Sequence, residues 1–436
     1  MTATRTRPYA PTITTIGGAP DVDSVSEAET STADRALVAT VFLLGACHSQ
    51  TLVPIAAPAS FVLFVIAAGR RGFRFTLHAA VGLVLAVYLL ALAGLNGNLD
   101  GVHPVTFVLD FGPALYALTL LALLLSVNWR REEAAKILSA GLAGVAAVTL
   151  VGFVADLAGM RLLGETLSIK GRFEGLLSGP NALAGSAGSA LLLAASQAVL
   201  PSNATPRWVR WVAVALGAAF LAAVSRGYTL GLLAAGGFMI VTVRGQFRRP
   251  SRLVLALLTV GVLLPLVTFQ LADRIDGSSE DASVSTRFLL FDRAFDLWSE
   301  SPLTGIGIGT FEQRNVDLDA VVPGLASLRI QGDYQRELVR FDAEGGQHTH
   351  NVVLQTLVDG GLIGLAMIGF LLVAAWRAAA DAANDWLHLY TRVSLVFLLV
   401  SGFTGGLTLY SASIATLPFL AFAFVLRSAP SASPLS

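Results

Sequence analysis

Long apolar runs recur along almost the whole chain, and they constrain its fold more than any other feature. The 436 residues are 54% hydrophobic and 13% charged, and this charged share is about half of that in an ordinary globular protein. A water-soluble domain of this length could not bury so much apolar surface. The lipid bilayer must therefore act as the solvent for most of the chain.

The apolar runs predict an all-α fold, a polytopic transmembrane helical bundle of about 12 helices. Several runs approach the length of about 20 residues that a helical span requires. Pro54 and the polar residues 47–50 separate the first two runs. The predicted helices cover 36–50, 52–69, 76–95, 111–127, 137–158, 181–200, 209–224, 228–243, 253–271, 352–375, 388–408 and 412–426.

Charge supports the alternation of these helices across the membrane. With the N-terminus in the cytoplasm, every even-numbered helix end meets a basic group, as at Arg70, Arg130 and Arg377. The loops 96–110 and 409–411, which then lie outside, contain no Lys or Arg. This distribution follows the positive-inside rule.

The topology divides the chain into five segments. Residues 1–34 are polar and lack the apolar core of a signal peptide, which indicates a disordered cytoplasmic tail. Aromatic residues at i, i+3, i+7 and i+10 predict a helix over 285–300, and the glycines of 304–309 predict a tight turn where backbones approach closely. We expect a tail (1–34), nine membrane helices (35–271), a large, partly helical extracytoplasmic loop (272–349), three further helices (350–427) and a cytoplasmic C-terminal tail (428–436).

Charge and cysteine content exclude several classes of protein. The 29 basic and 29 acidic residues cancel, so the chain has no basic footprint for nucleic acid. Cys47 is the sole cysteine, which excludes an intramolecular disulfide and a cysteine metal cluster.

Polar groups near membrane depth are costly and therefore informative. Arg226 follows Ser225 at a junction of two predicted helices, where it could bind a phosphate through its fork of donors or merely extend to the headgroups. Arg287 precedes the aromatic helix of the large loop, where an ion-paired, structural role is the alternative. Both junctions fall on the outer side in this topology.

Two further segments carry candidate groups. His348 and His350 are two residues apart and do not share a helical face, so a metal site is a poor fit, whereas a histidine beside Asn351 at a membrane entry could accept a proton. Arg172 and Asn181 flank Pro180, a residue common at helix starts. Arg172 could line an external groove.

Taken in order, these motifs resemble the O-antigen ligase and O-antigen polymerase superfamily of bacterial envelope glycosyltransferases. The resemblance spans roughly 165–375, and its most specific part is the His-Asn segment followed by Gly-Leu-Ile-Gly. The motifs are Arg-Phe-x-Gly at 172–175, Pro-Asn at 180–181, Ser-Arg-Gly at 225–227, Ser-Pro-Leu-Thr-Gly-Ile-Gly at 301–307, His-Asn-Val-Val-Leu-Gln at 350–355 and Gly-Gly-Leu-Ile-Gly at 360–364.

The resemblance implies a metal-independent glycosyltransferase that needs no cofactor. The donor would be a glycan on undecaprenyl diphosphate, and the acceptor a second glycan or lipid A-core, on the periplasmic face of the bacterial inner membrane. Arg226 and Arg287 would stabilise the leaving diphosphate, and His350 would act as the base. Substrate binding would involve Arg172, Asn181, His348 and Asn351.

Other functions stay open at this stage. A polysaccharide-precursor transporter or flippase would also suit a dozen helices, although the halves of the chain show no matching pair of broken helices. A non-catalytic scaffold would tolerate replacement of the candidate residues. Within the family, polymerisation is slightly favoured over ligation, and a partner that regulates chain length is a further possibility.

Overall fold

The computed structural model describes most of the predicted helical core. The predicted runs 36–50 and 253–271, all of 52–69 except residue 62, most of 111–127, the two tails (1–34 and 429–436) and most of the large loop lie outside the described residues. The count of twelve helices and the five segment boundaries therefore stay predictions. The described residues are 62, 75–96, 118, 121–122, 124–127, 133–160, 168–169, 172–173, 180–200, 208–223, 225–243, 280–309, 311, 349–380, 385–404, 409 and 412–428.

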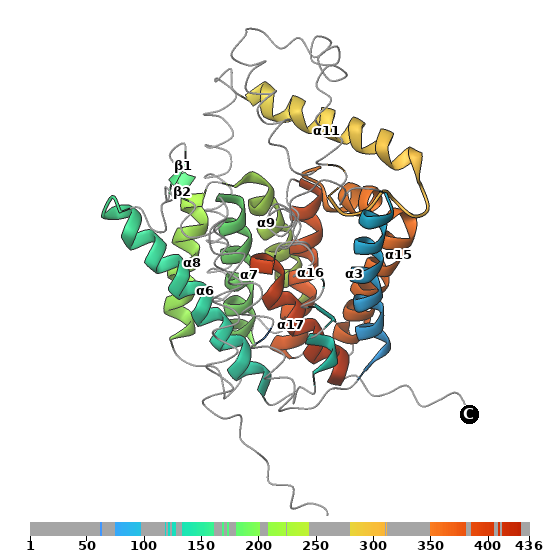
Figure 1. The fold of residues 1–436 in the computed structure, drawn as a ribbon. Helices are drawn as coiled ribbons and strands as arrows, with labels where there is room; N and C mark the ends of the chain where they lie inside the picture. Colours follow the sequence, from blue (N-terminus) through green and yellow to red (C-terminus); the bar gives the residue numbers. More distant parts are fainter. Residues whose placement is uncertain are drawn as a thin grey trace, which may run out of the picture.

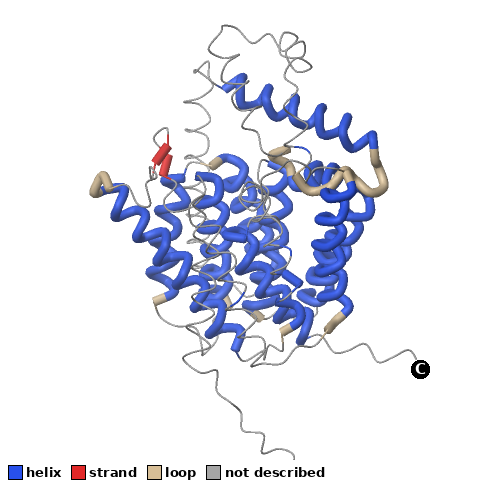
Figure 2. Tube along the Cα trace, viewed as in Figure 1, coloured by secondary structure: helices blue, strands red, loops and turns tan. Residues whose placement is uncertain are grey.

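Helices dominate the described structure, with one short hairpin beside them (Figure 2). Their bounds agree with the predicted apolar runs to within a few residues at most ends. The helices are α3 (Leu77–Leu95), α6 (Ala134–Leu157), α7 (Pro180–Val199), α8 (Val209–Ala223), α9 (Arg226–Val243), α11 (Glu280–Glu300), α15 (Val352–Ala380), α16 (Trp386–Thr404) and α17 (Ala412–Ser428), and the strands are β1 (Ser168–Ile169) and β2 (Arg172–Phe173).

Six of these helices are long and apolar enough to cross a membrane: α3, α6, α7, α9, α15 and α16. The helix α3 shows why water is the wrong solvent for them. Leu85 and Leu89 are fully buried on its inner face, yet Val84 and Val87 on the other face are 56% and 58% exposed. A helix that is apolar on both faces suits a lipid environment. The prediction of an all-α, polytopic membrane protein is confirmed.

Small residues let the central helices α7, α9 and α16 pack closely. A Cβ atom at Gly188 of α7 would lie 2.8 Å from the ring of Phe397 on α16, and one at Gly231 of α9 would lie 3.1 Å from the Phe397 carbonyl oxygen. Glycine at such positions allows membrane helices to approach one another. The three helices form a closely packed frame for the residues at their ends.

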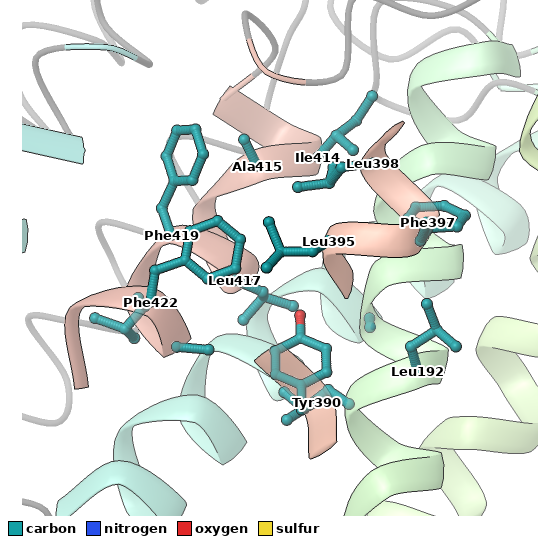
Figure 3. Close-up of a cluster of buried hydrophobic side chains, with 14 of the residues drawn as sticks. Leu192, Tyr390, Leu395, Phe397, Leu398, Ile414, Ala415, Leu417, Phe419 and Phe422 are labelled. Atoms are coloured by element: carbon teal, nitrogen blue, oxygen red, sulfur yellow. The ribbon is translucent and has the colours of Figure 1, made fainter. Parts of the chain in front are cut away.

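A buried apolar cluster extends from this frame to α17 (Figure 3). Leu398 of α16 lies near Ile414 of α17, Phe397 and Phe419 belong to the same cluster, and all four are buried. The hydroxyl of Tyr390 is the polar atom in this view, and it forms a 3.1 Å hydrogen bond with the Ser189 hydroxyl of α7. Its polar group is thereby satisfied at membrane depth.

The helix α15 is broken, which the sequence analysis did not predict. Gly361 has φ +61° and ψ −160°, so the helix stops there and resumes in a second segment. Glycine adopts this conformation far more readily than other residues. The break lies about nine residues into the helix, within the Gly-Gly-Leu-Ile-Gly motif.

The helix α11 lies across one end of the bundle (Figure 1). The predicted helix over 285–300 is confirmed, and it begins earlier, at Glu280. Its buried face consists of Leu290, Ala294 and Leu297. Phe295 of the aromatic stripe is instead 51% exposed.

Candidate functional site at the ends of four helices

Asn351 fixes the start of α15. Its side-chain oxygen accepts hydrogen bonds from the backbone amides of Val353 at 2.9 Å and Leu354 at 3.1 Å, which is N-capping. Its side-chain nitrogen donates to the carbonyl oxygen of Phe403 near the end of α16, at 3.4 Å. The beginning of α15 is therefore tied to the end of α16.

His350 immediately precedes this cap and has an unusual backbone. Its φ is +52°, whereas the other described residues with positive φ are glycines. A non-glycine residue in this region costs free energy and is frequently found at functional sites. Thr349, just before it, is fully buried, and the Thr349 hydroxyl donates to the Asn351 carbonyl oxygen at 2.8 Å. The side chain of His350 itself is half-buried.

Arg226 begins α9 at a tightly packed junction. The hydroxyl of the preceding Ser225 donates to the side-chain oxygen of Asn181, in the first turn of α7, at 2.8 Å. A Cβ atom on the following Gly227 would lie 3.0 Å from the carbonyl oxygen of Thr404. The Thr404 hydroxyl donates to the Gly227 carbonyl oxygen at 3.2 Å. The Ser-Arg-Gly motif therefore fits against both α7 and the end of α16.

These contacts gather the ends of α7, α9, α15 and α16, which we call the helix-end cluster. Asn181 meets Ser225, Gly227 meets Thr404, and the neighbouring Phe403 meets Asn351. Three of the four helices begin here, at Pro180, Arg226 and Val352. Helix N-termini carry partial positive charge and exposed amide donors. The cluster places Arg226 and His350 at an end suited to an anion.

Arg287 lies on α11, which packs onto this end of α15. Leu290, Ala294 and Leu297 of α11 form a small buried core with Ile306, Phe311 and Val358. Val358 belongs to the first segment of α15, the segment that His350 precedes. The side chain of Arg287 lies outside the described residues, so the structure places its helix and not its guanidinium.

A loop of residues 301–309, which follows α11, is inserted into the break of α15. The amides of Ile306 and Gly307 donate to the carbonyl oxygens of Val358 and Asp359, at 2.8 and 3.0 Å. In return, two amides that follow the break donate to this loop: Leu362 to the Pro302 carbonyl at 3.0 Å and Ile363 to the Leu303 carbonyl at 3.1 Å. We call this four-bond exchange the backbone clamp.

The clamp satisfies main-chain groups that a broken membrane helix would otherwise leave unpaired. It also explains the glycines of both motifs. A Cβ atom at Gly305 would lie 2.5 Å from the Gly361 amide nitrogen, and one at Gly307 would lie 2.5 Å from the Ala93 amide nitrogen of α3. The predicted turn with closely approaching backbones is confirmed. Tyr88 of α3 adds a 2.8 Å hydrogen bond from its hydroxyl to the Thr304 carbonyl.

Residues 211–369 match the family model described as O-antigen ligase. This segment belongs to the O-antigen ligase family. It runs from α8 to the second part of α15, so it contains Arg226, Arg287, the backbone clamp and His350. No curated protein matches the chain. The match supports a membrane enzyme of the O-antigen ligase and polymerase type, a family whose general substrates are a lipid-linked glycan and a glycan or lipid A-core acceptor.

Two predicted binding residues are not joined to the helix-end cluster by the described contacts. Arg172 lies on β2, which pairs with β1 in a hairpin beside α8, and the Arg172 side chain is outside the described residues. The neighbouring Phe173 is buried and meets the ring of Phe153 on α6 edge-on, at 5.5 Å. His348 also lies outside the described residues. Both positions stay predictions. Arg172 precedes the matched segment 211–369, and His348 falls within it.

Asn181 and Asn351 have structural partners at the cluster. The oxygen of Asn181 accepts from Ser225, and the amide of Asn351 caps α15 and bonds to α16. Their contribution to substrate binding is untested. These contacts indicate that both asparagines hold the helix ends of the cluster in place.

Sequence reasoning missed the polar residues inside the first segment of α15. Gln355 and Asp359 are 3% and 1% exposed, and the Gln355 side-chain nitrogen donates to both Asp359 carboxylate oxygens, at 3.0 and 3.1 Å. Their i, i+4 spacing in an apolar run is the signal that could have revealed them. Among the described residues, no group of three or more His, Cys, Asp or Glu side chains could hold a metal ion.

Proposed function

We propose that the protein transfers glycan from an undecaprenyl-diphosphate carrier to an acceptor on the outer face of the bacterial inner membrane. The observation that carries the proposal is the helix-end cluster. It brings Arg226 and His350 to one end of the bundle, where three helix N-termini meet and where α11, with Arg287, lies across (Figure 1). Arg226, which is suited to bind an anion, and His350, which is suited to accept a proton, are thereby near the same membrane face.

The proposed reaction is a displacement at the anomeric carbon of the donor sugar. An acceptor hydroxyl oxygen forms the new bond to that carbon, and the bond from the carbon to the phosphate oxygen breaks with inversion. The electron pair leaves with the lipid diphosphate, whose growing negative charge Arg226 and Arg287 stabilise. The proton of the acceptor hydroxyl passes to His350.

The chemistry of the chain does not by itself identify the acceptor. We keep polymerisation slightly ahead of ligation. In polymerisation the acceptor is the next lipid-linked repeat, and in ligation it is lipid A-core. Arg172, Asn181, His348 and Asn351 are the proposed contributors to binding of diphosphate or glycan. A regulator of chain length would be an additional partner in polymerisation.

The test is a profile of lipid-linked and surface glycans by mass spectrometry and gel electrophoresis. The strains compared lack the gene, or carry the wild-type gene or Arg226→Ala. Single repeats that accumulate on the lipid while long chains vanish would identify a polymerase. Long chains that accumulate on the carrier and disappear from their final acceptor would identify a ligase. Unchanged pools in both strains would contradict glycan transfer.

The second candidate function is transport of a polysaccharide precursor. The broken helix α15 favours it, because transporters commonly bind substrates at such breaks. However, the backbone clamp fills this break. A small cavity among α3, α15 and α17 is lined by Leu, Ile and Phe side chains, including Leu85, Ile368 and Phe419, so it offers a sugar no polar side chain. Movement of a labelled lipid-linked glycan across proteoliposomes in the Arg226→Ala variant would favour transport.

A further inference from the structure

Asp359 is a buried carboxylate that the proposed reaction does not use. It is 1% exposed, in the first segment of α15, two residues before the break at Gly361. A buried carboxylate is expensive unless hydrogen bonds compensate it. The Gln355 side-chain nitrogen supplies such bonds to both of its oxygens, at 3.0 and 3.1 Å. The backbone clamp holds Asp359 from the other side, through its carbonyl oxygen and the Gly307 amide.

The hydrogen bonds to Asp359 also orient the side-chain amide of Gln355. In the structure the Gln355 NH2 group faces both carboxyl oxygens of Asp359, which can accept its hydrogen bonds. Its oxygen then points the other way, and it accepts the backbone N–H of Thr349 at 3.0 Å. Asp359 therefore determines, through Gln355, which atom faces the residue before His350.

The hydrogen bond between Gln355 and Thr349 lies beside His350, whose backbone conformation needs support from its neighbours. His350 has φ +52°, a conformation that a histidine does not keep without help from its surroundings. On its C-terminal side, the Asn351 cap fixes the chain. On its N-terminal side, the Thr349 amide is held by Gln355, and the Thr349 hydroxyl accepts from the Asn351 amide at 3.2 Å. His350 is thus bracketed by two buried anchors.

We propose that Asp359 and Gln355 are positioning residues that hold His350 in its working orientation. The inference rests on the proposed function, in which His350 takes the acceptor proton. It assigns to Asp359, the residue before the Gly-Gly-Leu-Ile-Gly motif, a role in the rate of transfer, exerted through Gln355 and Thr349 without contact with substrate. A chain of polar groups inside an apolar span otherwise costs stability without benefit.

The experiment measures kcat and KM in nanodiscs, with the lipid-linked glycan purified from the deletion strain as donor. The variants are Gln355→Met, which keeps the shape and removes the hydrogen bonds to Thr349 and Asp359, Asp359→Leu, Asp359→Asn and the double variant Gln355→Met/Asp359→Leu. Thr356→Val is the matched control, because it removes another buried hydrogen bond of the same helix, the 2.7 Å bond to the Val352 carbonyl. Thermal unfolding of each variant is recorded in parallel.

We expect Gln355→Met and Asp359→Leu each to lower kcat about 100-fold, since misplacing a catalytic group by an ångström costs this much. KM should stay within about twofold, because ground-state binding is not altered. Asp359→Asn should restore most of the rate, as its amide still offers an oxygen to Gln355. The double variant should be no slower than either single one, because both act through one contact. Thr356→Val should leave kcat near wild type.

Two results would overturn the inference while leaving glycan transfer intact. One is a near-normal kcat in Gln355→Met while His350→Ala is inactive. The other is a further loss when Gln355→Met is added to His350→Asn, a variant expected to keep a residual rate, since a residue that acts through His350 has nothing left to act on. If Asp359→Leu does not fold, Gln355→Met and Asp359→Asn carry the test. Full activity of His350→Ala would instead contradict the base assigned under the proposed function.

Discussion

Arg226 and His350 each begin or precede a helix whose first turn is fixed by neighbours from another part of the chain. For Arg226 the neighbours are Asn181 and Thr404, and for His350 the neighbour is Phe403. Their backbone positions are therefore set by contacts, and the side chains can act from a rigid base. Arg287 differs, because its helix is held to α15 by apolar packing. Substitutions at these three residues test chemistry more directly than they test folding.

Arg287→Lys should be poorly tolerated if Arg287 binds the diphosphate. A guanidinium offers a planar fork of donors to two phosphate oxygens, whereas an ammonium offers a point charge. We expect a loss of glycan transfer of about 1.5–3 kcal/mol in transition-state free energy, the range for a hydrogen bond to a charged group. Glycan profiles at matched protein levels measure it.

Arg293→Lys on the same helix is the control for this change, since it makes the same substitution on α11. It should leave glycan output unchanged. Near-normal output from Arg287→Lys would remove Arg287 from the diphosphate site.

His350→Asn separates the chemistry of His350 from its backbone. Asparagine tolerates positive φ better than most residues, so the variant should insert and unfold at nearly the wild-type temperature. It cannot act as a base, and we expect transfer to fall about 100- to 10,000-fold, the usual contribution of general base catalysis. Retention of the wild-type rate in this variant would show that the His350 imidazole is dispensable.

At the scale of elements, the backbone clamp joins α11 to α15. It uses main-chain atoms only, so its specificity lies in the glycines that let the two segments meet. Aromatic spacing predicted α11, and the apolar run predicted α15, because a segment in lipid satisfies its backbone as a helix. The break could not be predicted in the same way. The partners of Leu362 and Ile363 are Pro302 and Leu303, which are distant in sequence.

Gly361→Ala should destabilise the protein through the clamp. Its φ is +61°, and a Cβ atom there would collide with the Leu303 carbonyl oxygen. We expect a cost of about 1–3 kcal/mol from the strained backbone alone, with a lower unfolding temperature in detergent and less glycan transfer.

Gly369→Ala on the same helix is the matched control. A Cβ atom at Gly369 meets nothing within 4 Å, and alanine is the better helix former by about 1 kcal/mol. This variant should be as stable as the wild type or more so. Equal unfolding temperatures for the two variants would contradict the clamp as a source of stability.

For the whole molecule, the structure orders the helices so that α7, α9 and α15 begin at one end and α6 and α8 begin at the other (Figure 1). Hydropathy and charge predicted this alternation. They could not predict the cross-links between helix ends, such as Ser225 with Asn181, because single hydrogen bonds leave no periodic pattern. The hairpin of β1 and β2 was also missed, since strands of two residues are too short for an alternating signal.

The proposed orientation predicts which end can be labelled from outside the cell membrane. In a Cys47→Ser background, a cysteine introduced at Ser299 of α11 should react with an impermeant maleimide in intact spheroplasts. A cysteine introduced at Ala380, where α15 ends, should react only after lysis. Both positions are exposed. The reverse pattern would place the helix-end cluster in the cytoplasm and exclude a periplasmic reaction.

The break at Gly361 also has a consequence for the order in which this protein is assembled. Residues 301–309 leave the ribosome before α15 does, so they must wait outside the bilayer until their partner segment arrives. A straight helix can enter lipid with all its amides paired, whereas a broken one cannot. We therefore expect α15 to be inserted as one continuous helix. It would bend only when residues 301–309 replace the internal hydrogen bonds of the helix around Gly361. Maturation of the catalytic end would then be a post-insertion event, later than translocation itself.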